Sequence, residues 1–265
     1  MNIIVDKSFV IGSSLDELKN LSKDNNLILP AVLAYELSTT EKKDQSKVAW
    51  AKLNTISKNI KLIERINDLM KYEIENQKPF GNIEDFFCEF SFSVDDAILN
   101  SEFTKQQKFI INRLKIEWEK EGFDNYKIIS SNVFFDLPEI QNIKGQSSVD
   151  YLPFLEKVAN DEDLIKNIYT EIKPKKFPPV KKLNKNWAIF RYLQMNIMAG
   201  IEYTRKYGIG NINVKSKNAI NDNLDLEYTM LGVLCKNIAS NDEKIKLFFK
   251  LCCPEGNIFY RKVRA

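Results

Sequence analysis

The chain opens with an unbroken run of apolar residues that ends at an acidic one. Ile3, Ile4 and Val5 follow one another without polar alternation and lead into Asp6. Such a run is typical of a central parallel strand that is buried on both faces, and it delivers the next side chain to the carboxyl edge of the sheet. Ligands of open α/β sheets bind at that edge. An aspartate there can cap a helix, bind a metal ion, or do both.

The next residues alternate between helical and strand patterns. Residues 13–21 combine a serine cap with leucines at helical spacing, and residues 27–29 form a short apolar run. Pro30 then starts a helix that extends to Leu37. The order strand, helix, strand, helix is that of a growing parallel sheet.

The alternation returns at the end of the chain. The pattern predicts a helix over residues 224–235, a short strand, a helix over 243–252 and a final strand at 258–260. The residues between the two ends show mainly helical patterns, at 44–77, 94–121, 151–172 and 187–207. We therefore predict an α/β fold, a parallel sheet flanked by helices, with a large and mostly helical insertion. The predicted sheet platform comprises residues 1–40 and 212–265, and the insertion comprises residues 41–211.

Composition removes several classes of chemistry. The 265 residues include no histidine, which excludes Ser-His-Asp and Cys-His catalysis and histidine-bound zinc. The four cysteines have no C-x-x-C spacing and fit buried positions in a reducing compartment. Neither a signal peptide nor an apolar run of about 18 residues is visible, so we expect a cytoplasmic protein without a membrane partner. The net charge of +3 is too small to indicate a nucleic-acid partner by itself.

Acidic residues stand where the predicted strands end or helices begin. Asp6 closes the first strand, Glu36 lies on the helix after the second, Asp225 starts a platform helix, and Asp242 follows a short strand. Asp222, one turn before Asp225, competes with it for the same role. Each acid has a structural explanation, since Asp225 and Asp242 are good helix caps and Glu36 could be solvated. Together, however, they would repel one another at one sheet edge unless a cation such as Mg²⁺ or Mn²⁺ neutralised them.

Four motifs, taken together, resemble those of PIN-domain nucleases. In chain order they are Ile3-Ile4-Val5-Asp6, Leu29-Pro30-Ala31-Val32-Leu33-Ala34-Tyr35-Glu36, Asp225-Leu226-Glu227-Tyr228 and Ser240-Asn241-Asp242. The resemblance implies a PIN-like platform and metal-dependent endonucleolytic hydrolysis of phosphodiester bonds, usually in RNA. It assigns the catalytic and metal-binding roles to Asp6, Glu36, Asp225 and Asp242, and a supporting role to Ser240. The implied cofactor is Mg²⁺ or Mn²⁺, and the expected partners are RNA and an inhibitory or regulatory protein.

A basic, proline-rich segment occupies residues 173–185. Its lysines include Lys175, Lys176, Lys181 and Lys182, and they alternate with prolines and apolar residues. This composition favours an extended strap. Two interpretations stay open, a strap that follows a phosphate backbone and a solvated linker.

Two other functions compete with the nuclease interpretation. The first is a catalytically inactive PIN-like scaffold that binds RNA or protein. The second is a phosphatase or nucleotide-binding protein, but no glycine-rich loop follows the first strand, where Gly12 stands alone. The sequence therefore favours the nuclease and keeps the scaffold as its alternative.

Overall fold

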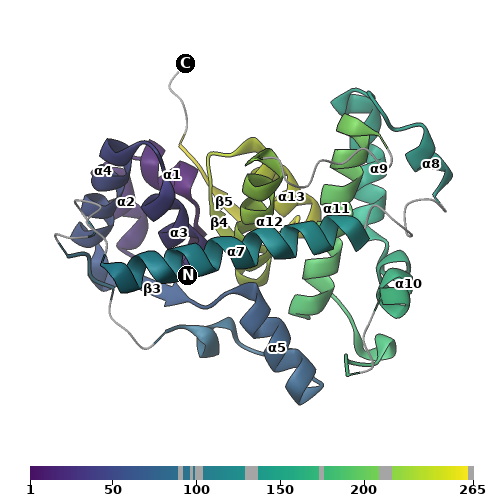
Figure 1. The fold of residues 1–265 in the computed structure, drawn as a ribbon, viewed down its shortest axis with the longest axis horizontal. Coiled ribbons are helices and arrows are strands. Elements are labelled where there is room, and N and C mark those ends of the chain that lie inside the picture. The colour runs from purple at the N-terminus through teal and green to yellow at the C-terminus, as the bar shows by residue number, and fades with distance from the viewer. Residues whose placement is uncertain are drawn as a thin grey trace. The chain divides into compact units, whose positions relative to one another are not determined.

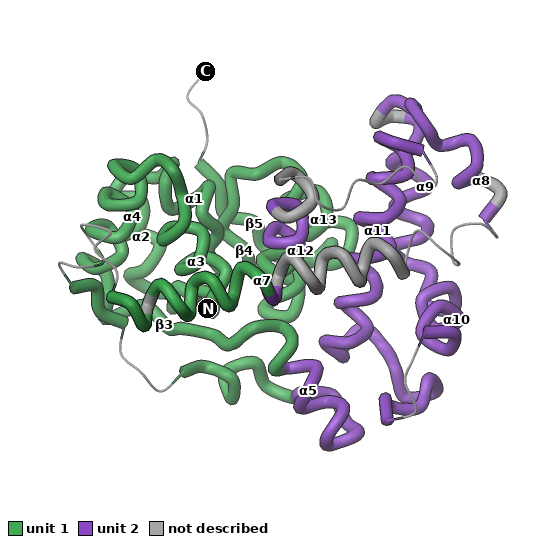
Figure 2. Tube along the Cα trace, viewed as in Figure 1, with its two compact units in different colours: residues 1–68, 81–116, 227–265 green, residues 69–80, 117–226 purple. Residues whose placement is uncertain are grey.

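The computed structural model of the protein describes residues 1–88, 92–95, 98, 104–128, 137–172, 176–208 and 217–261. The chain divides into two compact units (Figure 2). Unit 1 comprises residues 1–68, 81–116 and 227–265, and unit 2 comprises residues 69–80 and 117–226. These limits differ from the boundaries at 40/41 and 211/212 that the sequence pattern suggests.

Unit 1 is built on a sheet of five parallel strands (Figure 1). The strands are β1 (Asn2–Val5), β2 (Asn26–Pro30), β3 (Ile60–Ile63), β4 (Asn237–Ala239) and β5 (Asn257–Phe259). Their order across the sheet is β3-β2-β1-β4-β5, and all four neighbouring pairs are parallel. The predicted α/β fold with a parallel sheet and flanking helices is confirmed.

The central position of β1 follows from its sequence. Ile3, Ile4 and Val5 are all fully buried, as the absence of polar alternation predicts. Ile4 is paired with Ile28 of β2 on one side and with Ile238 of β4 on the other. The strand therefore has apolar neighbours within the sheet and covered faces above and below it.

Helices surround the sheet of unit 1. They are α1 (Lys7–Gly12), α2 (Leu15–Ser22), α3 (Ala31–Thr39), α4 (Lys43–Thr55), α13 (Glu243–Cys252) and the short 3₁₀ helices η1 (Ser57–Asn59) and η2 (Ile83–Phe86). Helices α1, α3 and α4 pack against one another. Helix α2 begins with a capping box, in which the Ser14 hydroxyl accepts from the Glu17 amide and the Glu17 carboxylate accepts from the Ser14 amide. The serine cap of this helix is thus confirmed.

Unit 2 is organised around one long helix. Its own helices are α8 (Pro138–Gln141), α9 (Ser148–Asn160), α10 (Glu162–Ile172), η4 (Val180–Lys182) and α11 (Ala188–Tyr207). Helix α11 packs against α9 and α10, and its side chains are buried nearly all round. The helices α5 (Ile66–Asn76), α7 (Lys105–Ile128) and α12 (Lys217–Cys235) have residues in both units.

The prediction of a single helical pattern over residues 44–77 is wrong in its middle. Residues 57–63 instead form η1 and β3, which pairs with β2 along its whole length. Ile60 and Ile63 are buried while Lys61 is exposed. Apolar residues three apart fit a helix and an edge strand equally well over so short a stretch, and pairing with β2 decides between them.

The predicted long helix is also displaced. Val94 and Asp95 are not helical, α7 begins at Lys105, and it continues through Gly122 to Ile128. A glycine inside a helix costs only about 1 kcal/mol relative to alanine, so Gly122 does not have to end the helix. None of the helices in the described ranges combines the length and the apolar character needed to cross a bilayer.

Candidate active site at the carboxyl edge of the sheet

Asp6 is a buried carboxylate at the end of the central strand. Its side chain is the N-cap of α1, where Oδ1 accepts a hydrogen bond from the Phe9 amide at 2.7 Å. The Ser8 hydroxyl lies 2.9 Å from both carboxylate oxygens, and the Ser240 hydroxyl donates to Oδ2 at 2.6 Å. Asp6 is only 2% exposed, and hydrogen-bond donors from α1 and from Ser240 hold its carboxylate in place.

Burial makes this carboxylate unusually basic. Desolvation raises the pKa of Asp6 from 3.8 to about 6, although hydrogen bonds from Ser240, Phe9 and Ser8 lower it in part. The negative charge of Asp242 raises the pKa further. The Asp242 carboxylate is therefore close enough to oppose the ionisation of Asp6.

Asp242 follows β4, the strand beside β1 in the sheet. It is the N-cap of α13, and its Oδ1 accepts from the amides of Lys244 at 2.8 Å and Ile245 at 3.1 Å. The predicted capping role of Asp242 is confirmed. The Asp242 amide donates to Ser240 Oγ at 3.0 Å, and the same hydroxyl donates to Asp6. Ser240, which is fully buried, thus links the Asp6 carboxylate to the backbone of Asp242.

The sheet topology explains why these residues meet. From β1 the chain turns to β2 on one side, whereas from β4 it turns to β5 on the other. The segments that follow β1 and β4 therefore diverge, and such a point of reversed strand order is where open α/β sheets bind ligands. The Asp6 amide donates to the Ala239 carbonyl at 3.1 Å, which fixes the two strand ends side by side.

Glu36 lies on α3 and is held by two partners. Lys7 Nζ is 3.3 Å from Oε1, and the Tyr228 hydroxyl donates to Oε2 at 2.7 Å. The Glu36 side chain is only 16% exposed, so the alternative prediction that Glu36 is solvated is wrong. Lys7 directly follows Asp6, so the positively charged side chain of Lys7 connects Glu36 to the edge where Asp6 lies.

The prediction that Asp225 starts a helix is wrong. Helix α12 begins at Lys217, so Asp222 and Asp225 both lie within it and neither caps its start. Both belong to unit 2, whereas Asp6, Glu36, Ser240 and Asp242 belong to unit 1. Asp222 accepts a short hydrogen bond from the hydroxyl of Tyr203 on α11. Residues 217–223 read as a polar turn because their apolar positions are sparse.

The basic segment belongs to unit 2. Lys175 lies outside the described residues, and Lys176, Lys181 and Lys182 are exposed. The segment is fixed through its backbone, since Gln77 Nε2 donates to the Lys176 carbonyl at 3.1 Å and the Tyr169 hydroxyl donates to the Pro178 carbonyl at 2.6 Å. The segment is therefore anchored, but turns and η4 replace the predicted extended course over much of residues 176–185.

Sequence reasoning missed three residues of this edge. Ser8 bonds to Asp6, and Lys7 and Tyr228 bond to Glu36. A serine two positions after an aspartate that ends a strand is a local signal for the first contact. The other two contacts join segments far apart in the chain, and no local pattern indicates them.

The carboxylate and hydroxyl oxygens of this edge are ligand types that suit a hard cation. In the described part of the chain, no three acidic or cysteine side chains are grouped so that they could hold a metal ion. Ser240 bridges the Asp6 carboxylate and the Asp242 backbone amide, and Mg²⁺ is commonly held by one or two carboxylates together with water and substrate phosphates. A two-carboxylate site therefore fits these residues, whereas Glu36 would first have to exchange Lys7 for the metal.

Comparison of the chain with protein-family models, with curated proteins and with solved structures finds no match.

Proposed function

We propose that this protein is a Mg²⁺- or Mn²⁺-dependent endoribonuclease with Asp6 and Asp242 at its catalytic centre. The observation that carries the proposal is that Ser240, at the point of reversed strand order, joins the Asp6 carboxylate to the backbone amide of Asp242, whose negative charge acts on Asp6. A buried carboxylate whose pKa is raised to about 6 beside a second carboxylate favours a bound cation, because the cation would stabilise both charges.

The order of the acidic motifs along the chain supports the same proposal. The chain resembles PIN-domain nucleases at Asp6, Glu36 and Asp242, and a parallel α/β sheet is the fold that the resemblance implies. In this proposal residues 41–211 are an insertion into a PIN-like platform. The resemblance also assigns a role to Asp225, with Asp222 as the alternative, and Lys175, Lys176, Lys181 and Lys182 would contact the phosphate backbone.

Each residue of the pair has a defined task in the proposed reaction. Asp6 and Asp242 would hold the divalent ion, which supplies a water of lowered pKa for in-line attack on the phosphate. Ser240 would keep the Asp6 carboxylate oriented through its 2.6 Å hydrogen bond. Lys7, next to Asp6, would hold Glu36 until the cation or the substrate replaces it.

The test is cleavage of a fluorescein-labelled single-stranded RNA with Mn²⁺. Asp242→Asn keeps a good N-cap on α13 but removes the charge, so the protein should fold and lose at least about 100-fold in rate. Asp6→Asn should do the same. The matched control is Asp161→Asn, because Asp161 caps α10 in unit 2 by accepting from the Leu164 amide at 2.9 Å. Full activity in Asp242→Asn, or equal losses in the control, would contradict the proposal.

A second candidate function is an inactive scaffold that binds RNA or protein. The observation in its favour is the ion pair between Lys7 and Glu36, which gives one of the four acids a protein cation as its partner. In this case the RNA binds with similar affinity in the wild type and in Asp242→Asn, and no cleavage occurs with Mg²⁺ or Mn²⁺. Measuring binding and cleavage on the same RNA separates the two candidates.

A further inference from the structure

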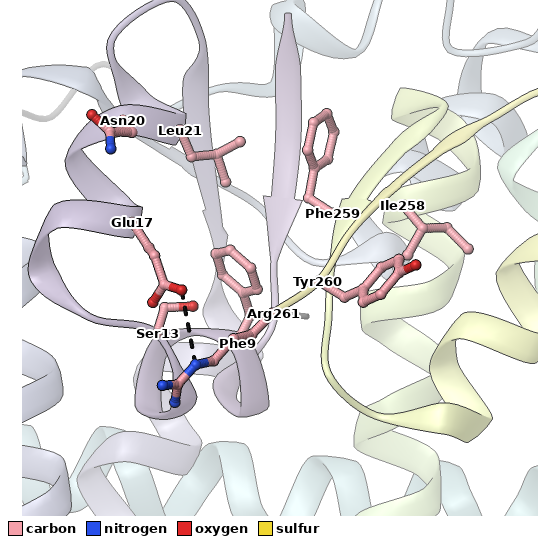
Figure 3. A pocket seen from close by; sticks show the side chains of 9 residues that line it. All are labelled: Phe9, Ser13, Glu17, Asn20, Leu21, Ile258, Phe259, Tyr260 and Arg261. Atoms are coloured by element: carbon pink, nitrogen blue, oxygen red, sulfur yellow. Dashed lines mark ion pairs between the residues drawn. The ribbon is translucent and has the colours of Figure 1, made fainter. Parts of the chain in front are cut away.

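We propose that a pocket beside the candidate active site binds one unpaired nucleobase of the substrate strand, an inference that rests on the proposed nuclease function. The pocket has a volume of about 410 Å³ and lies within unit 1 (Figure 3). Helix α2 forms one side, and β5 with the two residues after it forms the other. Its size is in the range of small-ligand sites.

The walls of the pocket are mainly aromatic and aliphatic. Leu21 of α2 and Phe259 of β5 lie on opposite sides, and Phe9 of α1 lies between them (Figure 3). Tyr260 lines the pocket on the side of β5. Aromatic side chains can hold a base by stacking, which is sequence-tolerant because every base has a π-face.

A buried hydroxyl in the pocket makes no hydrogen bond to the described residues. The side chain is that of Ser13, which is 2% exposed and lines the pocket. A buried polar group without a partner is unfavourable, and it calls for a ligand or water that supplies one. If the Ser13 hydroxyl turns into the pocket, the ring nitrogens and carbonyl or amino groups of a base can donate to it or accept from it.

The charged residues of the pocket balance each other. Arg261 Nε lies 3.8 Å from Glu17 Oε1, so the lining carries one positive and one negative side chain. A bare phosphate gains little from such a lining. The guanidinium plane and the carboxylate instead offer donors and an acceptor to the edge of a base.

A chain of hydrogen bonds places the pocket beside Asp6. The Arg261 amide donates to Asn241 Oδ1 at 2.8 Å, and the Asn241 amide donates to Ser8 Oγ at 2.9 Å. Ser8 in turn is bonded to the Asp6 carboxylate. Helix α1, which starts at Asp6 and ends next to Ser13, is six residues long, or about 9 Å. A base in the pocket would therefore keep its own phosphate, or the next one, near the acidic pair.

This pocket favours an unpaired strand over a duplex. A base inside a duplex is stacked and paired, so it enters a pocket of this kind only after unstacking, at a cost of a few kcal/mol. Bases of loops and ends reach such pockets without that cost, and proteins read them by stacking and by hydrogen bonds to their edges. We therefore infer that the enzyme prefers unpaired strands to duplexes.

The experiment measures binding without cleavage. Fluorescence anisotropy in EDTA compares a labelled adenine pentaribonucleotide with a fully abasic pentamer that carries the same phosphates. The wild type should bind the adenine pentamer at least about tenfold more tightly, equivalent to one stacked base. Leu21→Trp, which fills the pocket, should remove this difference, whereas Val48→Trp, at a site that is 53% exposed outside the pocket, should keep it.

Ser13→Ala provides a second variant. Removing a hydroxyl that lacks a partner should leave the unfolding free energy unchanged or raised, while affinity for the adenine pentamer falls about fivefold. Equal affinity of the wild type for both pentamers, or wild-type preference in Leu21→Trp, would overturn the proposal. The outcomes separate it from the nuclease proposal: base preference without Mn²⁺-dependent cleavage defeats the nuclease alone, and cleavage that needs Asp242 without base preference defeats the pocket alone.

Discussion

Glu73 lies on α5, and its carboxylate is enclosed within unit 2 at the N-terminus of α11. It is fully buried, and it accepts backbone hydrogen bonds from Ala188 at 2.7 Å, Ile189 at 2.9 Å and Phe80 at 3.3 Å. Helix α11 has Trp187 as its N-cap residue, which supplies no side-chain acceptor. Glu73 therefore satisfies the first amides of α11 from another segment of the chain. The perturbation is Glu73→Gln.

The magnitude follows from the pKa of this group. Burial raises the pKa of Glu73 from 4.5 to about 7, with the three hydrogen bonds opposing the rise. The folded protein then binds the proton more tightly than the unfolded chain, so the free energy of unfolding falls as the pH rises from about 4.5 to above 7. At about 1.36 kcal/mol per unit, the loss between pH 5 and pH 8 is about 2.5 kcal/mol.

The assay is urea unfolding of the wild type and Glu73→Gln at pH 5 and pH 8. Glutamine keeps one acceptor oxygen but turns its NH₂ group toward a backbone amide, which costs roughly 1–3 kcal/mol at both pH values. Only the wild type also loses the ionisation contribution. The stability change from pH 5 to pH 8 should therefore be about 2.5 kcal/mol smaller in the variant. Taking this difference cancels the titration of Asp6, which both proteins share.

Glu75→Gln is the control, because Glu75 lies on α5 as Glu73 does. Glu75 is 62% exposed and pairs only loosely with Lys71, at 4.0 Å, so its substitution should not alter the pH dependence. If the wild type and Glu73→Gln lose the same stability between pH 5 and pH 8, ionisation of Glu73 does not control this pH dependence.

Substitutions at three further positions test local features of unit 1, each by urea unfolding. Ser14→Ala removes the capping box with Glu17 and should cost about 1 kcal/mol, and Ser14→Asp should restore most of it. Gly232→Ala places a Cβ 2.9 Å from the Ile238 side chain, so it should cost about 1–3 kcal/mol, and no loss would show that Ile238 can shift freely. Lys52→Met removes the donor to three backbone carbonyls at the end of α1 and should cost roughly 1–3 kcal/mol, whereas Lys52→Arg should cost less.

The elements that the sequence predicts well are those whose signal is local. Strand β1 carries three consecutive branched apolar residues, and α13 has Asp242 as its cap and apolar residues at helical spacing. Helix α11 has the same kind of spacing and a glycine, Gly208, at its end with φ of 85°. For each of these, the residues that form the element also specify where it starts and stops.

The elements that the sequence misses depend on distant partners. Strand β3 exists because Ile60 and Ile63 pair beside β2, and α12 extends back to Lys217 through residues that look like a turn. The same holds for the candidate site. Proximity of Asp6 and Asp242 follows from parallel topology, but the ion pair of Glu36 with Lys7 requires the packing of α3 against α1.

Capping alone does not account for the arrangement of Asp6 and Asp242. A cap needs one acceptor oxygen near the first amides of a helix, and such a residue is normally at the surface. Asp6 is instead 2% exposed, its pKa is raised by burial, and a second carboxylate adds repulsion. Burial and this repulsion make the ionised form of Asp6 less stable, and an asparagine would cap α1 without either cost. In the function proposed above, a bound cation would offset this cost, which helix capping does not, and this is why we place the proposed chemistry at this edge.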